Sequence, residues 1–324
     1  MRRPVGRPAD DRGGERGFAL VLVIWGLGLI SLIAFTVMTA ERFRVLAAAN
    51  LIENARAEAL AEAGVNLVRL ELVSALAGGT ATPLRLATNG RPLICAMPGG
   101  ALAALAVEDE GGKLDLNAAS PKAVAALLRG FGAAVDEADR LAAAIAEFSH
   151  TSRNTVLDDV AFAAYAADGR AYGPKKGPFD SAFELDQVLG MRPELLRAIL
   201  PYVTVHSHKP GVDPRVAAPA LLAALAGDDV AAVAQLATDD EAAAEASVRG
   251  VPSEFLSPST NRSFLIHAEA RTPGGGSFAR EAVVGLTAGD PPELLYEWRR
   301  GGARFRARLD VASGRSRANS WPPC

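Results

Sequence analysis

The most constraining feature of the sequence is an apolar run near its N-terminus. Residues 18–40, FALVLVIWGLGLISLIAFTVMTA, contain no charged side chain. As a helix rising about 1.5 Å per residue, this run is about 34 Å long, which is enough to cross the apolar core of a bilayer. Residues 1–17 are rich in Arg, Gly and Pro, so we expect them to be disordered and to remain on the cytoplasmic side.

Three interpretations of this run are open. A secretory signal peptide has a shorter apolar region, followed by a small-x-small cleavage site. A plain signal anchor fits the hydropathy. The third interpretation is one helix of roughly 55 to 60 residues, partly in the membrane and partly outside it, because apolar residues continue to recur mostly at three- and four-residue steps. These residues are Leu46, Ile52, Ala55, Ala59, Ala63, Leu67, Leu70 and Val73.

The junction between the charged leader and the apolar run supports the third interpretation. The residues ERG followed by FALVLVIWGLGLISLIAF resemble the prepilin-type N-terminus of type IV pilins and type II secretion pseudopilins. The resemblance implies that a prepilin peptidase cuts after Gly17 and leaves Phe18 as a methylated N-terminus. Helices inside a membrane associate largely through small residues. The candidates for close approach to neighbouring helices are Gly26, Gly28 and Ala34.

One departure from that family is informative. Most members have Glu at the fifth mature position, where this chain has Leu22. A carboxylate inside the bilayer costs about 2.5–3.5 kcal/mol unless it is paired, and in the family it is thought to pair with the amine of a neighbouring subunit. A subunit at the tip of a filament has no such neighbour above it. The resemblance therefore narrows to the minor pseudopilins known as general secretion pathway protein K.

The middle of the chain has a helix–hairpin–helix pattern. Ser120 and Pro121 predict the start of a helix that ends near Arg129, the sequence GFG predicts a tight turn, and a second helix is expected over 135–148. A weaker copy lies at residues 178–205, with its two helices capped by Ser181 and opened by Pro193.

Such units often bind DNA phosphates through the hairpin and the following helix N-terminus. Here Asp136, Glu137 and Asp139 crowd that position, and no Lys or Arg lies between Gly132 and Arg140. We therefore expect a structural or protein-contact role. A membrane-anchored DNA-binding or DNA-uptake protein is kept as the alternative.

Several segments of the middle and C-terminal parts also resemble protein K: LDLNAASPKAVAALL, GFG, FDSAFELDQVLGMRPELLRAILPYVTV and YEWRR. Some members of that family bind calcium in an acidic, Trp-containing stretch. Here Glu147 and Phe148 replace the expected Asp and Trp, and Asp158 and Asp159 are the next acids. Calcium needs six to eight oxygen ligands. We therefore expect no cofactor and no metal, with calcium as the one open alternative.

The C-terminal third contains the signals of an antiparallel sheet. Strands are expected over 263–271 and 278–286 around a Gly-rich turn, and residues 294–300 and 305–309 extend the pattern. The predicted fold is α+β: a pilin-like long helix packed on an antiparallel sheet, with a large helical insertion of the helix-hairpin-helix or SAM-like type. The predicted segments are a leader (1–17), a transmembrane helix (18–40), an amphipathic helix with the first part of the pilin-like domain (41–108), the helical insertion (109–209), further helices with the C-terminal sheet (210–309) and a disordered tail (310–324).

No catalytic motif emerges from the sequence. The four histidines lack the Cys or acid partners of a metal site, and no phosphate-binding or nucleophile motif is present. Two cysteines do not form a disulfide framework, so we expect Cys95 and Cys324 to be unpaired. We therefore expect no enzyme but a single-pass protein of the bacterial inner membrane with a periplasmic domain. Its expected partners are other minor pseudopilins, the prepilin peptidase, and the secretion machinery with its cargo.

Overall fold

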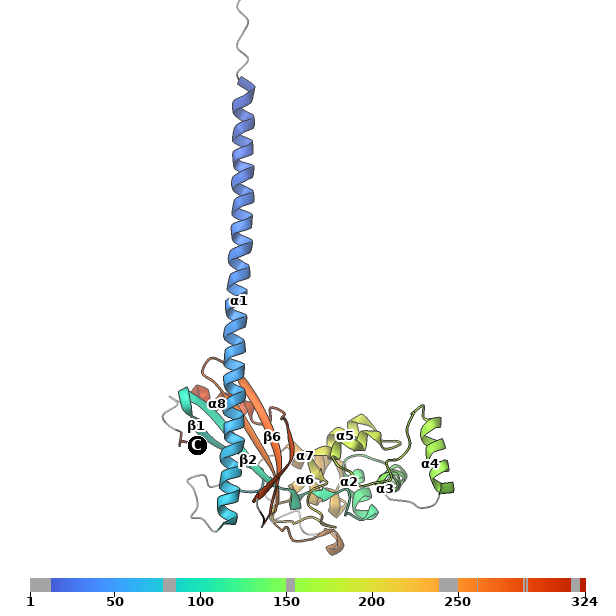
Figure 1. The fold of residues 1–324 in the computed structure, drawn as a ribbon. Coiled ribbons are helices and arrows are strands. Elements are labelled where there is room, and N and C mark those ends of the chain that lie inside the picture. Colours follow the sequence, from blue (N-terminus) through green and yellow to red (C-terminus); the bar gives the residue numbers. More distant parts are fainter. Residues whose placement is uncertain are drawn as a thin grey trace, which may run out of the picture. The chain divides into compact units, whose positions relative to one another are not determined.

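The computed structural model describes residues 13–77, 86–149, 155–238, 250–260, 262–287, 289, 291–315 and 321–324. The chain forms two compact units, Met1–Ala55 and Arg56–Cys324. Helix α1, Gly13–Leu76, runs without interruption through both of them (Figure 1). The prediction of one helix that continues beyond the apolar run is therefore confirmed. Residues 78–85, which follow this helix, lie outside the described residues, so the break that GGTATP at residues 78–83 predicts is not described.

The second unit is built around a five-stranded sheet. Its strands pair in the order β1-β2-β5-β6-β7, and every pair is antiparallel. The two strands before residue 110 therefore belong to the same sheet as the C-terminal hairpin. The bounds are β1 Leu93–Met97, β2 Ala101–Asp109, β5 Ser263–Arg271, β6 Ser277–Leu286 and β7 Glu293–Arg300.

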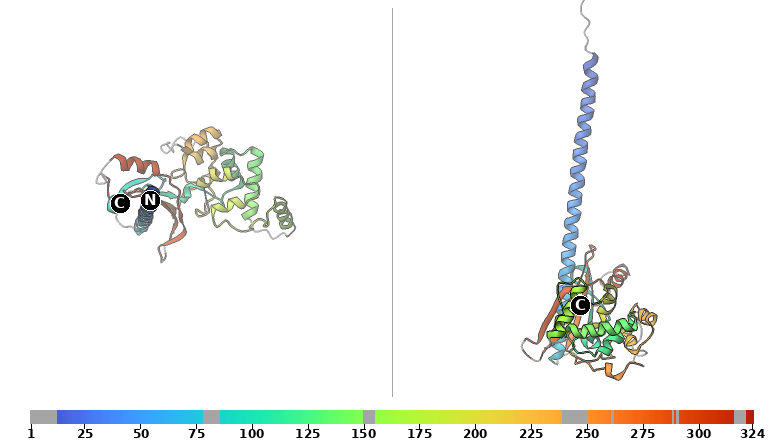
Figure 2. Two further views of the ribbon diagram at one scale, coloured as in Figure 1. Left: turned by 90° about the horizontal axis from the view of Figure 1, so that it is seen from above. Right: turned by 90° about the vertical axis from the view of Figure 1, so that its right-hand side faces the viewer.

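Each face of the sheet is covered by one helix, as the view along α1 shows (Figure 2). Val65 and Val68 of α1 pack in one core cluster with Leu105 and Ile266. The alternate residues of β2 point to the opposite face. There they pack against α8, Arg306–Arg315. This second cluster contains Leu102, Ala104, Ala106, Phe305, Leu309 and Ala312.

The face of α1 that packs on the sheet differs from the predicted stripe. Ala59, Ala63 and Leu70 are exposed, whereas the fully buried residues of this helix are Ala57, Ala61, Val65 and Val68. Leu67 and Val73 of the predicted stripe do pack against the sheet, so the stripe is only partly confirmed and the centre of the contact face is shifted towards Val65 and Val68. At Gly64 a Cβ atom would lie 2.7 Å from a methyl carbon of Leu105, so the helix approaches the sheet more closely than an apolar stripe of Leu would allow.

The segment between β2 and β5 is mainly helical. Two of the predicted start signals are confirmed: the Ala123 amide donates to Ser120 Oγ (3.2 Å), and the Phe183 amide donates to Ser181 Oγ (3.4 Å). The helix predicted after Ser181 is a short 3-10 helix. The elements are β3 Leu114–Asp115, α2 Pro121–Gly130, α3 Val135–Ser149, α4 Thr155–Ala167, a 3-10 turn at Ala182–Gln187, α5 Pro193–Ile199, β4 Val203–Thr204, α6 Pro219–Ala226 and α7 Val230–Thr238.

The helices that follow residue 209 pack with this helical segment. Leu221, Leu222 and Leu225 of α6 belong to the same core cluster as Leu127 and Leu128 of α2. We therefore use the term insertion for residues 110–262, which connect the end of β2 to the start of β5.

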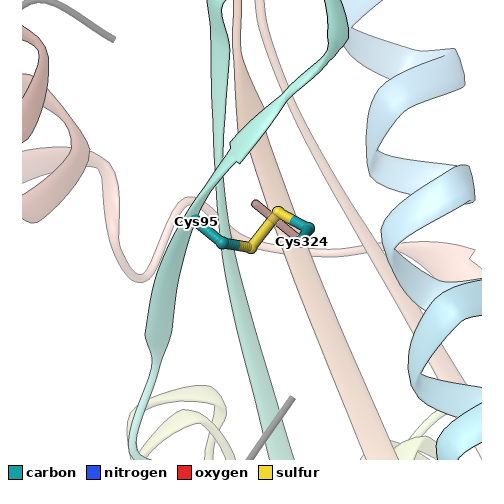
Figure 3. The surroundings of a disulfide bond; sticks show 2 residues. All are labelled: Cys95 and Cys324. Atoms are coloured by element: carbon teal, nitrogen blue, oxygen red, sulfur yellow. A yellow bond between two sulfur atoms is a disulfide. The ribbon is translucent and has the colours of Figure 1, made fainter. Parts of the chain in front are cut away.

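Two predictions about the C-terminal part are wrong. Residues 305–309 are not a strand and residues 310–324 are not all disordered, because α8 occupies Arg306–Arg315 and buries Leu309 and Ala312. Cys95 and Cys324 are also not free: they form a disulfide whose Cα atoms are 5.1 Å apart (Figure 3). The two cysteines are 229 residues apart in the sequence, so no local sequence pattern predicts that they pair.

Candidate functional site

The predicted processing and membrane-packing residues all lie on α1. Gly17 precedes the residues whose surroundings are described, whereas Phe18 is 71% exposed and Leu22 is 59% exposed. This helix is the one described helix that is long and apolar enough to cross a membrane, and its most apolar window has no buried residue. Among the described residues, the apolar surface of the run is therefore left for a bilayer or for other chains to cover.

The small residues of this run do not form a single strip. No atom lies within 4 Å of a Cβ placed at Gly26 or Gly28. At about 100° per residue, Gly26 and Gly28 point to nearly opposite sides of the helix, whereas Ala34 is about 80° from Gly26. Gly26 leaves a shallow depression in one face, which is lined by Phe18, Val21, Leu22, Trp25 and Leu29.

The helix–hairpin–helix is present, and its phosphate position is occupied by the chain itself. The Glu137 carboxylate accepts a hydrogen bond from the Ala134 amide (3.3 Å) and pairs with Arg192 Nε (2.7 Å). The hydrogen bonds from Arg192 lower the pKa of Glu137, which keeps the carboxylate charged. A phosphate would have to displace this anion, so the hairpin geometry disfavours DNA binding.

In and near the stretch that corresponds to the calcium region of the family, carboxylates form ion pairs with lysines. Asp180 Oδ2 and Glu184 Oε2 lie 2.7 and 2.9 Å from Lys175 Nζ, and Glu147 lies 3.4 Å from Lys176 Nζ. Phe148 is buried and stacks on Phe179. The side chains of Asp158 and Asp159 are outside the described residues, as are His150 and Arg153. Among the side chains that are described, no group of three or more His, Cys, Asp or Glu residues is arranged to hold a metal ion.

We expect calcium to leave the thermal unfolding temperature of the protein unchanged, because the ammonium groups of Lys175 and Lys176 already pair with the nearby carboxylates. The measurement is differential scanning fluorimetry with added CaCl₂ and with a chelator. The Lys175→Ala/Lys176→Ala variant is the comparison, since it frees these carboxylates. A saturable rise in the unfolding temperature of the unaltered chain would contradict the expectation.

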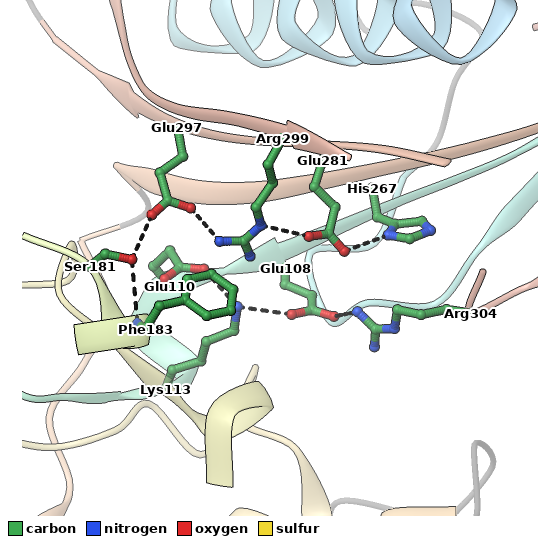
Figure 4. Close-up of polar contacts among 10 residues, drawn as sticks. All are labelled: Glu108, Glu110, Lys113, Ser181, Phe183, His267, Glu281, Glu297, Arg299 and Arg304. Atoms are coloured by element: carbon green, nitrogen blue, oxygen red, sulfur yellow. Dashed lines mark hydrogen bonds and ion pairs between the residues drawn. The ribbon is translucent and has the colours of Figure 1, made fainter. Parts of the chain in front are cut away.

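The contact between the sheet and the insertion is polar, and two chains of ionic groups cross it (Figure 4). In the first chain, His267 Nδ1 lies 3.0 Å from Glu281, and Glu281 accepts a hydrogen bond from Arg299 Nε (2.9 Å). Arg299 also pairs with Glu297, which accepts a hydrogen bond from the Ser181 hydroxyl of the insertion (3.1 Å). These contacts connect three neighbouring strands to the start of a 3-10 turn.

Aromatic contacts reinforce the same region. The Arg299 guanidinium lies 5.0 Å from the ring centroid of Phe183, and the rings of His206 and Tyr296 stack at 4.9 Å. Burial lowers the pKa of His206, so its ring is neutral in this stack at physiological pH. We call the whole set of contacts between the sheet and the insertion the seam.

The second ionic chain also consists of largely buried charges. Lys113 Nζ lies 3.0 Å from Glu108 and 2.7 Å from Glu110, while Arg304 pairs with Glu108 at 2.6 Å. The Thr204 hydroxyl donates to Glu110. Burial alone would raise the pKa of Glu108, but Lys113 and Arg304 outweigh it and hold that pKa at about 2. The two glutamates likewise raise the pKa of Lys113 against the effect of its burial.

A cleft of about 620 Å³ opens beside this chain. Several charged side chains that line it form ion pairs. Lys113 and Arg304 pair with Glu108, and Arg215 pairs with Asp213 at 2.6 Å. The described residues that line the cleft include no Ser, Thr, Cys or His. Sequence reasoning missed the seam, because its partners come from six separate stretches of the chain.

Comparisons with known proteins agree with this architecture. Residues 102–208 match the family model described as type II secretion system (T2SS), protein K. The fold is similar to a chain in the crystal structure of the GspK-GspI-GspJ complex from the enterotoxigenic Escherichia coli type 2 secretion system. The TM-score is 0.51 at 16% sequence identity, and the similarity covers 82% of this chain and 100% of that one. No curated protein sequence matches the chain. The chain thus matches the protein K family of the type II secretion system over residues 102–208, within a pilin-like α+β fold.

Proposed function

We propose that this chain is a structural minor pseudopilin that is cut by a prepilin peptidase between Gly17 and Phe18, methylated on Phe18, and assembled at the tip of a periplasmic pseudopilus. The observation that carries the proposal is the exposed apolar start of α1 in a chain whose insertion matches protein K. The E. coli structure is a complex of three pseudopilins, which supports other minor pseudopilins as partners of this chain.

The disulfide supports the periplasmic location of the second unit. Disulfides persist in oxidising compartments such as the bacterial periplasm and are rare in the cytosol. Cys95 is fully buried in the sheet, so its bond to Cys324 is part of the folded core. With Arg residues before the membrane helix, the proposed topology is a short cytoplasmic N-terminus and a periplasmic domain.

The experiment that tests the proposal is co-expression with a prepilin peptidase, followed by mass spectrometry of the purified chain. The expected product lacks residues 1–17 and carries one methyl group on Phe18. An inactive peptidase and the Gly17→Val variant serve as controls, and both should leave the leader in place. An intact leader with the active peptidase, or a cut after residue 40, would sink the proposal.

Leu22 gives a separate prediction about the tip position. We expect the Leu22→Glu variant to be recovered with other minor pseudopilins about 70- to 400-fold less, because an unpaired carboxylate in the bilayer costs about 2.5–3.5 kcal/mol. The measurement is co-purification from detergent-solubilised membranes, with Leu22→Met as the matched apolar control. Equal or greater recovery of the Glu variant would mean that a neighbour supplies a counter-charge, which contradicts a position at the tip.

A further inference from the structure

The two edge strands of the sheet are β1 and β7, and a short segment covers the edge of β1. The Ala96 amide donates to the Pro322 carbonyl (2.8 Å), and the Cys324 amide donates to the Ala96 carbonyl (3.1 Å). Ala96 and Pro323 form a parallel bridge. We call residues 321–324 the strap. An exposed strand edge has unpaired backbone groups that can bind a strand of another chain. The strap pairs with some of these groups and so covers part of the edge.

The outer side of β1 offers few hydrogen-bond donors. Because strand residues alternate, Ile94 points its backbone groups to the same side as Ala96, and positions 92 and 98 share that side. Both of these positions are Pro, which has no amide hydrogen. The free edge therefore has two donors, the amides of Ile94 and Ala96. The strap takes up the second of them.

The covalent bond is what keeps the strap in place. Two hydrogen bonds connect its backbone to β1, and Trp321 packs near Ile94 at the margin of the cluster that α8 forms with β2. The Cys95–Cys324 disulfide ties the strap directly to β1 and so raises the effective concentration of the strap at this edge (Figure 3). Cys95 is fully buried, whereas Cys324 is partly exposed, so Cys324 is the sulfur that another protein can reach.

We propose that the strap is a redox-controlled cover of the β1 edge, and that in the dithiol form this edge pairs with β1 of a second copy of the chain. To close the strap, the two thiols give up two protons and two electrons to the disulfide of a thiol–disulfide oxidoreductase, which becomes a dithiol. The reaction passes through a mixed disulfide on Cys324, and the Cys95 thiolate then displaces the oxidoreductase.

A second copy fits the open edge for two reasons. Residues 92–98, PLICAMP, carry no charge, so two such strands do not repel each other. An antiparallel pair about a two-fold axis would also oppose the same two residues, Ile94 and Ala96, from each chain, so each edge supplies the acceptors for the other. The strap prevents this self-pairing once the chain has reached an oxidising compartment.

The test uses the full chain in detergent, so that α1 is the same in every sample. Four proteins are compared by size-exclusion chromatography with light scattering and by hydrogen exchange: the oxidised chain, Cys324→Ser, a deletion of residues 321–324, and that deletion combined with Ala96→Pro. We expect exchange of the β1 amides to be at least tenfold faster in dilute Cys324→Ser than in the oxidised chain. The deleted chain should self-associate more than the oxidised chain, and Ala96→Pro should reverse this by removing the donor.

Two outcomes would overturn the proposal: β1 exchange and association unchanged by deleting the strap, or association that persists with Ala96→Pro. Protection of β5 and β6 amides reports whether the sheet remains folded in each variant. If the deletion loses that protection, the reduced unaltered chain provides the same comparison. Exchange and association equal to those of the oxidised chain would then overturn the proposal.

Discussion

Replacing Lys113 with Met is expected to lower the free energy of unfolding by about 3–5 kcal/mol, because it leaves buried carboxylates without their counter-charge. Lys113 is 11% exposed and lies between Glu108 and Glu110, which are 18% and 4% exposed. Arg304 still pairs with Glu108 in the variant, so Glu110 bears most of the loss. The measurement is urea unfolding of the full chain at pH 7, with tryptophan fluorescence as the signal.

The difference in the free energy of unfolding between Lys113→Met and the unaltered protein should depend on pH. In the unaltered protein the pKa of Glu108 is held at about 2, below its usual value of 4.5. The stability it contributes is therefore present above pH 4.5 and is lost as the pH falls towards 2. Without Lys113, only Arg304 lowers the pKa of Glu108, so the variant has less of this stability to lose and its deficit should shrink as the pH falls from 4.5 towards 2. Lys122→Met is the matched control on the exposed side of α2. Equal losses for the two variants would contradict this account of the seam.

Replacing Gly130 with Val is expected to cost about 3 kcal/mol, since an overfilled core forces side chains and backbone to shift. A Cβ at Gly130 would lie 2.4 Å from the Cβ and 2.7 Å from the Cα of Ala224, where α2 crosses α6. The second of these atoms belongs to the backbone and cannot rotate away. The loss is measured by the same urea unfolding.

Two further variants make this prediction specific. Ala224→Gly in the Gly130→Val chain should recover part of the loss, because it removes the nearer of the two atoms. Gly177→Val should be close to neutral, since no atom lies within 4 Å of a Cβ there. A large loss at Gly177, or no recovery with Ala224→Gly, would mean that the helix crossing does not set the cost.

The sequence predicted those elements whose signals are local. Ser120 and Pro121 marked the start of α2, and alternation around a Gly-rich turn marked β5 and β6. The five residues 305–309 are too few to distinguish a strand from the start of helix α8. Over a longer window, Phe305, Leu309 and Ala312 recur at helical spacing and cover one face of the sheet. A tertiary contact from Glu269, which accepts a hydrogen bond from the Phe305 amide, fixes where that segment begins.

The features that were missed depend on which segments become neighbours. Cys95 and Cys324 meet because β1 is an edge strand and the strap runs alongside it. The partners of Arg299 lie in β6, in β7 and in the insertion, and nothing near Arg299 in the sequence identifies Phe183. The centre of the contact face of α1 could not be predicted for a related reason. The missing Cβ of Gly64 allows close packing only because Leu105 lies opposite it in the folded chain.

The pairing of β2 with β5 makes the insertion a separable module. Asp109, the last residue of β2, lies directly opposite Phe264, the second residue of β5. The two points where the insertion leaves and rejoins the sheet are therefore adjacent, as they would be in an ordinary hairpin. A short turn could replace residues 110–262 without moving a strand, and a different domain could be grafted at the same place. Evolution can thus enlarge, exchange or trim the part of the molecule beyond this junction while the sheet and its two covering helices keep their geometry.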